Sequence, residues 1–353
     1  MFNIKRLLIV STGALISVTG ISEVAKAGTF KPAPIYTDIG KYTTTIAGDN
    51  NLADIYFPNP SNLKAGADKL PVVLLLQGAL VDKSNYSSYA KQVAGYGFVV
   101  VAPNSKLFIP GLGEALAPRT DQIDTALQKI AAENNNPSSP IAGIVDTQKV
   151  GLLGHSQGGA VGLSAIGNLC VAPALCPGSF TRPEQIKAGA FFGANLRDQN
   201  DVFFKINNDG IPIALLQGDL DGRALPGRAA RTYDNIQDPP KALINIAGAN
   251  HFSITNTSNP PGAIPDPIQA TLPNDVAIET IARWSGLFLR ASILNNKDAF
   301  NYVYFTGDAA DPNVTVKSER VPESAPTIAL LGVGITYAAS LKLRKRTVGV
   351  SKK

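Results

Sequence analysis

Short apolar runs alternate with longer amphipathic stretches along most of the chain. Six of these runs are five to seven residues long and end near turn-forming residues, which is typical of buried strands; they cover residues 71–77, 98–102, 149–153, 187–192, 211–217 and 241–246. The amphipathic stretches between and after them predict helices near residues 86–95, 119–134, 157–168, 226–236 and 275–294. Strands that alternate with helices form parallel sheets. The pattern therefore predicts an α/β fold, with a mostly parallel central sheet and helices on both faces.

Two further stretches refine this architecture. Residues 41–47 and 52–58 are β-prone and are separated by turn-forming residues, which predicts a hairpin at the sheet edge. Only about eighteen residues separate the strands at 187–192 and 211–217. Because so short a connection cannot fold as a separate cap domain, we expect an open cleft above the sheet.

The N-terminal segment has the parts of a secretory signal peptide. Residues 1–27 begin with Lys5 and Arg6, continue with an apolar core over 7–21, and end in the small-x-small sequence Ala-Lys-Ala at 25–27. We expect signal peptidase to remove this segment during export. An uncleaved membrane anchor is the alternative.

The chain between its two ends is long enough to bury one large core. Residues 28–306 are expected to form a single catalytic domain, and residues 307–320, which contain Asp, Pro and Ser, a linker. Residues 28–320 carry 23 basic and 25 acidic side chains, so the net charge of +5 comes from the two ends. Because the body is nearly neutral, no nucleic-acid partner is expected.

The C-terminal segment, residues 321–353, contains Pro322-Glu323, an apolar run over 327–341 that predicts a short transmembrane helix, and a basic tail that starts at Lys342. In this order of features it resembles the PEP-CTERM sorting signal of Gram-negative-type bacteria. The resemblance implies an exosortase-type sorting protease as a partner. It also implies a C-terminal membrane anchor, transient or permanent, on a body in the periplasm, at the cell surface or outside the cell. A plain anchor is the alternative.

The chain has two cysteines, Cys170 and Cys176, both directly after the predicted helix at 157–168. In an exported protein two cysteines so close in sequence favour a disulfide that closes a small loop. No histidine lies nearby in the sequence, so neither a metal site nor any cofactor is expected.

The sequence GHSQG at residues 154–158 lies between a predicted strand and a predicted helix. A G-x-S-x-G sequence in this context is typical of a nucleophile elbow. The glycines permit a sharp turn and close helix–strand packing. Ser156 would then project from the end of the strand as a nucleophile, and the amide of Gln157 would face the reacting carbonyl.

A nucleophilic serine of this kind needs a general base, and the chain has only two histidines. His155 precedes Ser156, so its side chain is expected to point away from the serine hydroxyl. His251 follows an apolar run that predicts a late strand, and it is therefore the candidate base.

The acid that orients the base is expected between the serine and the histidine in sequence. Asp219 and Asp221 both follow the strand at 211–217. We favour Asp221, because a turn that starts at Gly218 carries it past the strand end, whereas Asp219 is expected to cap that turn. The backbone amide of Ala79, after the strand at 71–77, is the candidate for the second oxyanion donor.

The order of these features resembles one branch of the α/β-hydrolase superfamily over roughly residues 40 to 300. This branch contains secreted cutinase-like and poly(ethylene terephthalate)-hydrolase-like esterases, with dienelactone-hydrolase and platelet-activating-factor-acetylhydrolase relatives. The resemblance implies a Ser156–His251–Asp221 triad, with the amides of Ala79 and Gln157 as the oxyanion hole. The loop at 77–79 lacks the aromatic residue, and the stretch 190–195 the tryptophan, that polyester hydrolases often place there.

Together these features predict an exported serine ester hydrolase, cutinase-like in type, that works through an acyl-enzyme on an ester substrate. A lipase- or chlorophyllase-like activity on long-chain esters is the alternative within enzymes. A non-catalytic surface-binding module on a hydrolase fold is the alternative outside them. The proline-rich stretch 257–267 directly follows His251 and would rim the cleft or form a passive surface loop.

Overall fold

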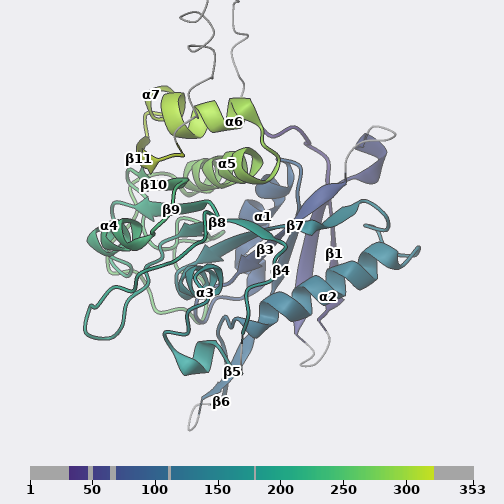
Figure 1. The fold of residues 1–353 in the computed structure, drawn as a ribbon, viewed down its shortest axis with the longest axis horizontal. Coiled ribbons are helices and arrows are strands. Elements are labelled where there is room, and N and C mark those ends of the chain that lie inside the picture. Colours follow the sequence, from purple (N-terminus) through teal and green to yellow (C-terminus); the bar gives the residue numbers. More distant parts are fainter. Residues whose placement is uncertain (1–31, 47–50, 64–68, 110–112, 179, 322–353) are drawn as a thin grey trace, which may run out of the picture. The chain divides into compact units, whose positions relative to one another are not determined.

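A mixed sheet forms the centre of the fold. The computed structural model describes residues 32–321, apart from 47–50, 64–68, 110–112 and 179 (Figure 1). In this part of the chain one sheet has the strand order β1-β2-β4-β3-β7-β8-β9-β10-β11. The strands are β1 (Ile39–Thr45), β2 (Leu52–Pro58), β3 (Leu70–Leu76), β4 (Val99–Pro103), β7 (Val145–His155), β8 (Ile186–Phe192), β9 (Ile213–Gly218), β10 (Lys241–Ile246) and β11 (Val314–Glu319). Neighbours from β4 to β10 run parallel, and both flanks of the sheet are antiparallel.

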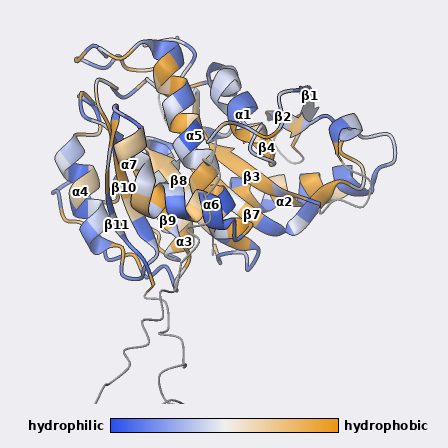
Figure 2. Cartoon of the chain, turned by 90° about the horizontal axis from the view of Figure 1, so that it is seen from above, coloured by the Kyte–Doolittle hydropathy of each residue, from blue (hydrophilic) through white to orange (hydrophobic). Residues whose placement is uncertain are grey.

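The predicted α/β class and mostly parallel sheet are confirmed. The six predicted inner strands are the parallel ones, and the predicted hairpin is the antiparallel pair β1–β2. All seven residues of β3 are buried, as expected for a strand covered on both faces. Figure 2 shows this as hydrophobic colour along the inner strands β3 and β7 and mixed colour along the helices α2 and α4.

Helices cover the two faces of the sheet. The main ones are α1 (Ser87–Ala94), α2 (Asp121–Asn135), α3 (Gln157–Ile166), α4 (Pro226–Asn235) and α5 (Asn274–Ile293). The helices α2, α3 and α4 share one apolar core with side chains such as Leu74 and Leu152. On the other face α5 packs on β7, where a side chain at Gly151 would touch Leu289 and Ile293, and α1 packs against α5.

Shorter elements connect these helices and strands. A separate antiparallel pair, β5 (Lys106–Ile109) and β6 (Gly113–Leu116), follows β4. Single turns of 3-10 helix occur at Pro60–Asn62, Lys83–Tyr86 and Pro173–Leu175. After α5 come α6 (Lys297–Asn301), a π-helical turn (Tyr302–Thr306) and α7 (Gly307–Ala310). The sequence pattern predicted none of these, because each is too short to show a period.

The linker predicted over 307–320 is wrong. Residues 307–310 form α7, and β11 pairs antiparallel with β10 at the sheet edge. Asp311 is buried and accepts hydrogen bonds from the side chains of Arg283 and Trp284 on α5. The folded body therefore extends beyond residue 306, because this segment covers the outer edge of β10 and pairs with the partly buried Arg283.

The two predicted sorting segments lie almost entirely outside the described residues. These are the signal peptide at 1–27 and the PEP-CTERM-like segment, of which only Val321 is described. Within the residues that the structure describes, no helix combines the length and the apolar character that a membrane span requires.

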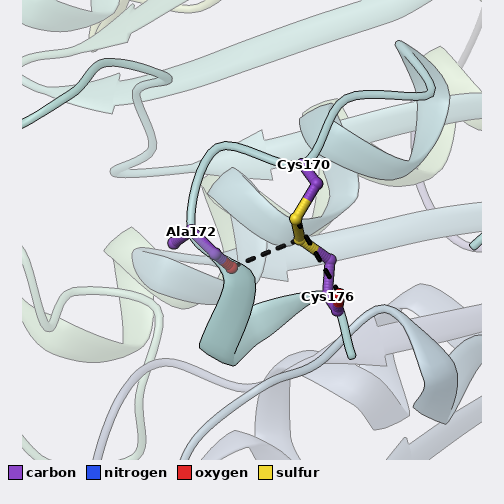
Figure 3. The surroundings of a disulfide bond; sticks show 3 residues. All are labelled: Cys170, Ala172 and Cys176. Atoms are coloured by element: carbon purple, nitrogen blue, oxygen red, sulfur yellow. Dashed lines mark hydrogen bonds between the residues drawn. A yellow bond between two sulfur atoms is a disulfide. The ribbon is translucent and has the colours of Figure 1, made fainter. Parts of the chain in front are cut away.

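The predicted disulfide is present between Cys170 and Cys176 (Figure 3). It closes a loop between α3 and β8 that contains Ala172 and the turn Pro173–Leu175. The backbone N–H of Thr120, next to α2, donates to the carbonyl of Leu175 at 2.8 Å. The loop is thus held by one covalent bond and by a contact with a neighbouring helix.

Candidate active site

Ser156 lies in a sharp turn between β7 and α3 and has a positive φ of 54°. Such a φ is sparsely populated by residues other than glycine and stores strain. Two glycines make the turn possible. A Cβ on Gly154 would lie 2.6 Å from the nitrogen of Gly159, and one on Gly158 would lie 2.2 Å from the carbonyl oxygen of Leu76. The G-x-S-x-G spacing is therefore a packing requirement of this turn.

His251 contacts both of its predicted partners. Its Nε2 lies 2.9 Å from Ser156 Oγ, and its Nδ1 lies 2.9 Å from Asp221 Oδ2. A carboxylate oxygen can only accept, so Nδ1 carries the proton and Nε2 is left to accept from the serine hydroxyl. The three side chains come from the ends of β7, β9 and β10, and parallel strands bring these ends to one edge of the sheet.

The carboxylate of Asp221 is buried, with 1% of the residue exposed, and is surrounded by donors. Its Oδ1 accepts the backbone N–H groups of Arg223 and Ala224 at 2.8 and 2.6 Å. The side-chain amide of Gln217, also buried, lies 3.3 Å from Oδ2. These contacts fix the carboxylate with one oxygen directed at the imidazole of His251.

Asp219, the alternative acid, has a different partner. It is exposed, and its Oδ1 accepts the backbone N–H of Gly248 at 2.7 Å. It therefore joins the turn after β9 to the turn after β10. The structure brings Asp221, and not Asp219, to His251.

Ala79 and Gln157 line the same cavity as Ser156. Gln157 is the first residue of α3, and the N–H groups at a helix N-terminus favour negative charge. Ala79 is held by its neighbours, because Leu80 donates its N–H to the carbonyl of Leu116 in β6 at 2.8 Å. Leu80 also has a positive φ of 61°. On the other side of Ala79, Gly78 donates its N–H to the hydroxyl of Tyr86 at 2.8 Å, so the backbone at Ala79 is held from both sides.

A cavity of about 710 Å³ opens beside Ser156. Part of its lining is apolar and comes from α3 and the disulfide loop: Ala160, Val171, Ala172 and Leu175. Another part is polar and follows β8 and Asp221: Asn195, Arg197, Asp198, Gln199 and Arg223. The cavity can therefore receive an ester with one apolar arm and one polar arm.

Gly193, the residue directly after β8, lies against the side chains of Asp221 and His251. Its φ is +58°, and a Cβ there would lie 3.0 Å from Asp221 Oδ2 and 3.2 Å from His251 Nδ1. A side chain at this position would displace the acid or the base. The glycine leaves this part of the cavity open.

Sequence reasoning missed Asp266, which lies in the proline-rich stretch after His251. Its buried carboxylate accepts the backbone N–H of His251 at 2.8 Å and that of Gly222 at 3.2 Å. Asp266 therefore joins the turn that carries the acid to the turn that carries the base. Ile264 from the same stretch lines the cavity, so the stretch does border the site. An aspartate among prolines gave no signal of this role, since its partners are backbone groups.

Comparison with protein families identifies the family of this chain. No curated protein matches the chain. A family model described as PETase, PET hydrolase-like, matches residues 39–264. The match includes Ser156, Asp221 and His251 and covers more than half of the chain. The chain therefore belongs to the PET hydrolase-like family of α/β-hydrolases, which act on ester bonds.

Proposed function

We propose that the protein is an exported serine ester hydrolase that works through an acyl-enzyme. The observation that carries this proposal is the continuous contact from Ser156 Oγ to His251 Nε2 and from His251 Nδ1 to Asp221 Oδ2, each at 2.9 Å. This is the arrangement that activates a serine hydroxyl at neutral pH.

In the first half-reaction Ser156 Oγ attacks the ester carbonyl carbon while its proton moves to His251 Nε2. The tetrahedral intermediate collapses, the alkoxide leaves with the proton from Nε2, and the acyl group stays on Ser156. In the second half-reaction a water gives its proton to Nε2 and attacks the acyl carbon. The proton then returns to Oγ as the acid leaves. Asp221 keeps the imidazole in the tautomer that each step needs.

The amides of Ala79 and Gln157 would stabilise the negative oxygen of each tetrahedral intermediate. Such donors act most strongly when they are fixed before the reaction begins. The strained turn at Ser156 and the hydrogen bond of Leu80 to Leu116 supply that rigidity.

The lining of the cavity favours aliphatic esters, as in cutinase-like enzymes, over aromatic ones. Among the described residues that line it, Phe252 is the one phenyl ring. The apolar part is formed by small aliphatic side chains on α3 and the disulfide loop. Long alkyl chains, as in lipase- or chlorophyllase-like substrates, would have to pass the charged residues beside it. We therefore expect highest activity on short to medium acyl chains.

We also propose that signal peptidase removes residues 1–27 and that an exosortase-type protease acts near Pro322. Strand β11 ends at Glu319, so a cut at this point would leave the sheet complete. A chain truncated after Arg320 should be a soluble, fully active esterase. Mass spectrometry of the native protein tests the processing: a mature form that starts at Met1, or loss of activity on truncation, would contradict it.

A fluorophosphonate probe and a panel of p-nitrophenyl esters test the catalytic proposal. The wild type should be labelled on Ser156 and should hydrolyse the esters. The Ser156→Ala variant should keep its fold by circular dichroism but lose labelling and about 10⁴-fold or more of its turnover. An unlabelled, inactive wild type would instead indicate a surface-binding module.

A further inference from the structure

His155 and Tyr86 form a buried polar pair next to the proposed triad that the reaction itself does not use. We propose that they are positioning residues, joining the loop of the oxyanion donor Ala79 to the loop of the base His251. This inference rests on the proposed function. It adds a device that holds two parts of the site, on different strands, in one arrangement.

The hydrogen bonds of the pair run in one direction. His155 Nε2 lies 2.8 Å from the backbone carbonyl oxygen of His251, which can only accept, so Nε2 carries the proton. His155 Nδ1 lies 2.9 Å from the hydroxyl of Tyr86. The hydroxyl of Tyr86 in turn accepts the backbone N–H of Gly78 at 2.8 Å. Tyr86 therefore donates to His155, and His155 donates to His251.

The protonation states fit this direction. Burial, with the nearby ring of His251 as a second cause, holds the pKa of His155 well below its usual range, so the imidazole is neutral. Burial raises the pKa of Tyr86, so its hydroxyl keeps the proton that it donates. A neutral imidazole has one donor and one acceptor, and both are used here.

The two ends of this chain of hydrogen bonds are the two loops that the reaction needs. Gly78 directly precedes Ala79, and the carbonyl that His155 holds belongs to His251. A Cβ on Gly78 would lie 2.7 Å from His155 Nδ1, so the loop can close on the imidazole only because residue 78 is glycine. His155 has no exposed surface and packs against the rings of Phe192 and Phe252. It therefore acts through the loops and not on the substrate.

Tyr89 provides a matched control for Tyr86. Both tyrosines are fully buried and lie three residues apart, and each makes a hydroxyl hydrogen bond. The partner of Tyr89 is Ser285 on α5, which does not line the cavity. Tyr86→Phe and Tyr89→Phe thus remove the same atom from similar surroundings, but only the first variant interrupts the connection between the two catalytic loops.

The test compares kcat, KM and inhibition by an alkyl boronic acid, which binds as a tetrahedral adduct. Tyr86→Phe should lower kcat by about 10- to 100-fold, since small misplacements of reacting groups have effects of this size. Its boronic acid affinity should fall in parallel, with KM changed less than about threefold. Tyr89→Phe should leave all three near wild type. Equal effects in both variants, or an unchanged kcat in Tyr86→Phe, would overturn the proposal.

Two substitutions at His155 keep the test falsifiable if Tyr86→Phe does not fold. The amide of His155→Gln reaches the position of Nε2 and can donate to the carbonyl of His251, but it leaves no acceptor at the position of Nδ1 that faces Tyr86. The shorter amide of His155→Asn reaches the position of Nδ1 and can accept from Tyr86, but it leaves no donor at the position of Nε2. Each variant should lower kcat by about 10-fold while KM changes little, because each loses one of the two hydrogen bonds that His155 makes. If either variant keeps wild-type kcat, the proposed positioning role is refuted. Failure of the proposed function would look different, because the wild type would then not react with the fluorophosphonate probe.

Discussion

The side chains of the proposed triad lie on short turns at the ends of β7, β9 and β10, whereas most of the apolar wall of the cavity lies on the loop between Cys170 and Cys176. Buried side chains brace the turns: Gln217 at Asp221, Asp266 at Gly222 and His251, and His155 at His251. The disulfide loop has one covalent bond and one backbone hydrogen bond to Thr120.

This difference suggests separate roles: the turns would carry out the chemistry, and the disulfide loop would shape the binding of the substrate. Proton transfer requires reacting atoms within hydrogen-bond distance. This requirement fits turns that are short and that are each held by hydrogen bonds from buried side chains. An apolar wall needs only the right volume, and a misplaced methylene there changes affinity far less than a misplaced proton acceptor changes rate. We therefore expect substitutions in the turns to lower kcat and substitutions in the loop to change substrate preference.

Among substitutions in the turns and the loop, the largest effect is expected when the aspartates after β9 are replaced one at a time by asparagine. Asp221→Asn should lower kcat by about 10³- to 10⁴-fold, because an amide cannot hold the required tautomer of His251. Asp219→Asn should lower it by less than about threefold, since Asp219 holds only the backbone of Gly248. Steady-state kinetics of the two variants decide the matter, and equal or reversed losses would remove Asp221 as the acid.

A smaller effect is expected when the brace between the two turns is weakened. Asp266→Asn brings an NH₂ group to a position where backbone N–H groups donate, so the link from Gly222 to His251 is lost. We expect kcat to fall about 10-fold and the free energy of unfolding by about 2 kcal/mol. Asp275→Asn on the exposed start of α5 is the control. Wild-type kinetics in Asp266→Asn would show that the turns at Gly222 and His251 keep their positions without Asp266.

The apolar wall should respond in substrate preference. Leu175→Ala enlarges the cavity beside the disulfide, so the ratio of kcat/KM for longer over shorter acyl esters should rise by about 3- to 10-fold. Leu225→Ala, an exposed leucine before α4, should leave this ratio unchanged. An unchanged ratio in Leu175→Ala would mean that the acyl chain binds elsewhere.

The smallest catalytic effect is expected from the disulfide itself. Replacing Cys170 and Cys176 together by serine should reduce the free energy of unfolding by about 2–3 kcal/mol on the loop-closure model. The kcat on a short ester should stay within about threefold of wild type, because the triad does not depend on this loop. Chemical denaturation and kinetics of the double variant measure both. A loss of kcat as large as that of Asp266→Asn would abolish the distinction between turns and loop.

Much of the fold was predictable because its signals are local. Each inner strand is a continuous apolar run, and the pattern alternates with helices, which leaves little choice but a parallel sheet. The turn at Ser156 was predictable for the same reason, since the two glycines that it requires are close in sequence. With only two histidines in the chain, the candidate base followed from the position of Ser156.

Other parts of the molecule depend on partners far away in the sequence. Residues 307–319 look like a linker because their polar side chains alternate with few apolar ones, and only pairing with β10 makes them part of the sheet. Tyr86 meets His155 across 69 positions. The partners of Asp266 are backbone N–H groups, which every residue except proline carries, so no side-chain pattern announces them.

The sequence by itself therefore determined the class of fold, the positions of its inner strands and of the edge hairpin, the turn that presents Ser156, and the candidates for base and acid. Only the tertiary structure decided between Asp219 and Asp221 as the partner of His251, where the domain ends, and which buried groups brace the site. The physical reason is the separation along the chain over which each kind of interaction acts. Periodicity and turn chemistry act between neighbours along the chain, whereas hydrogen bonds between loops exist only after the sheet has brought the strand ends together.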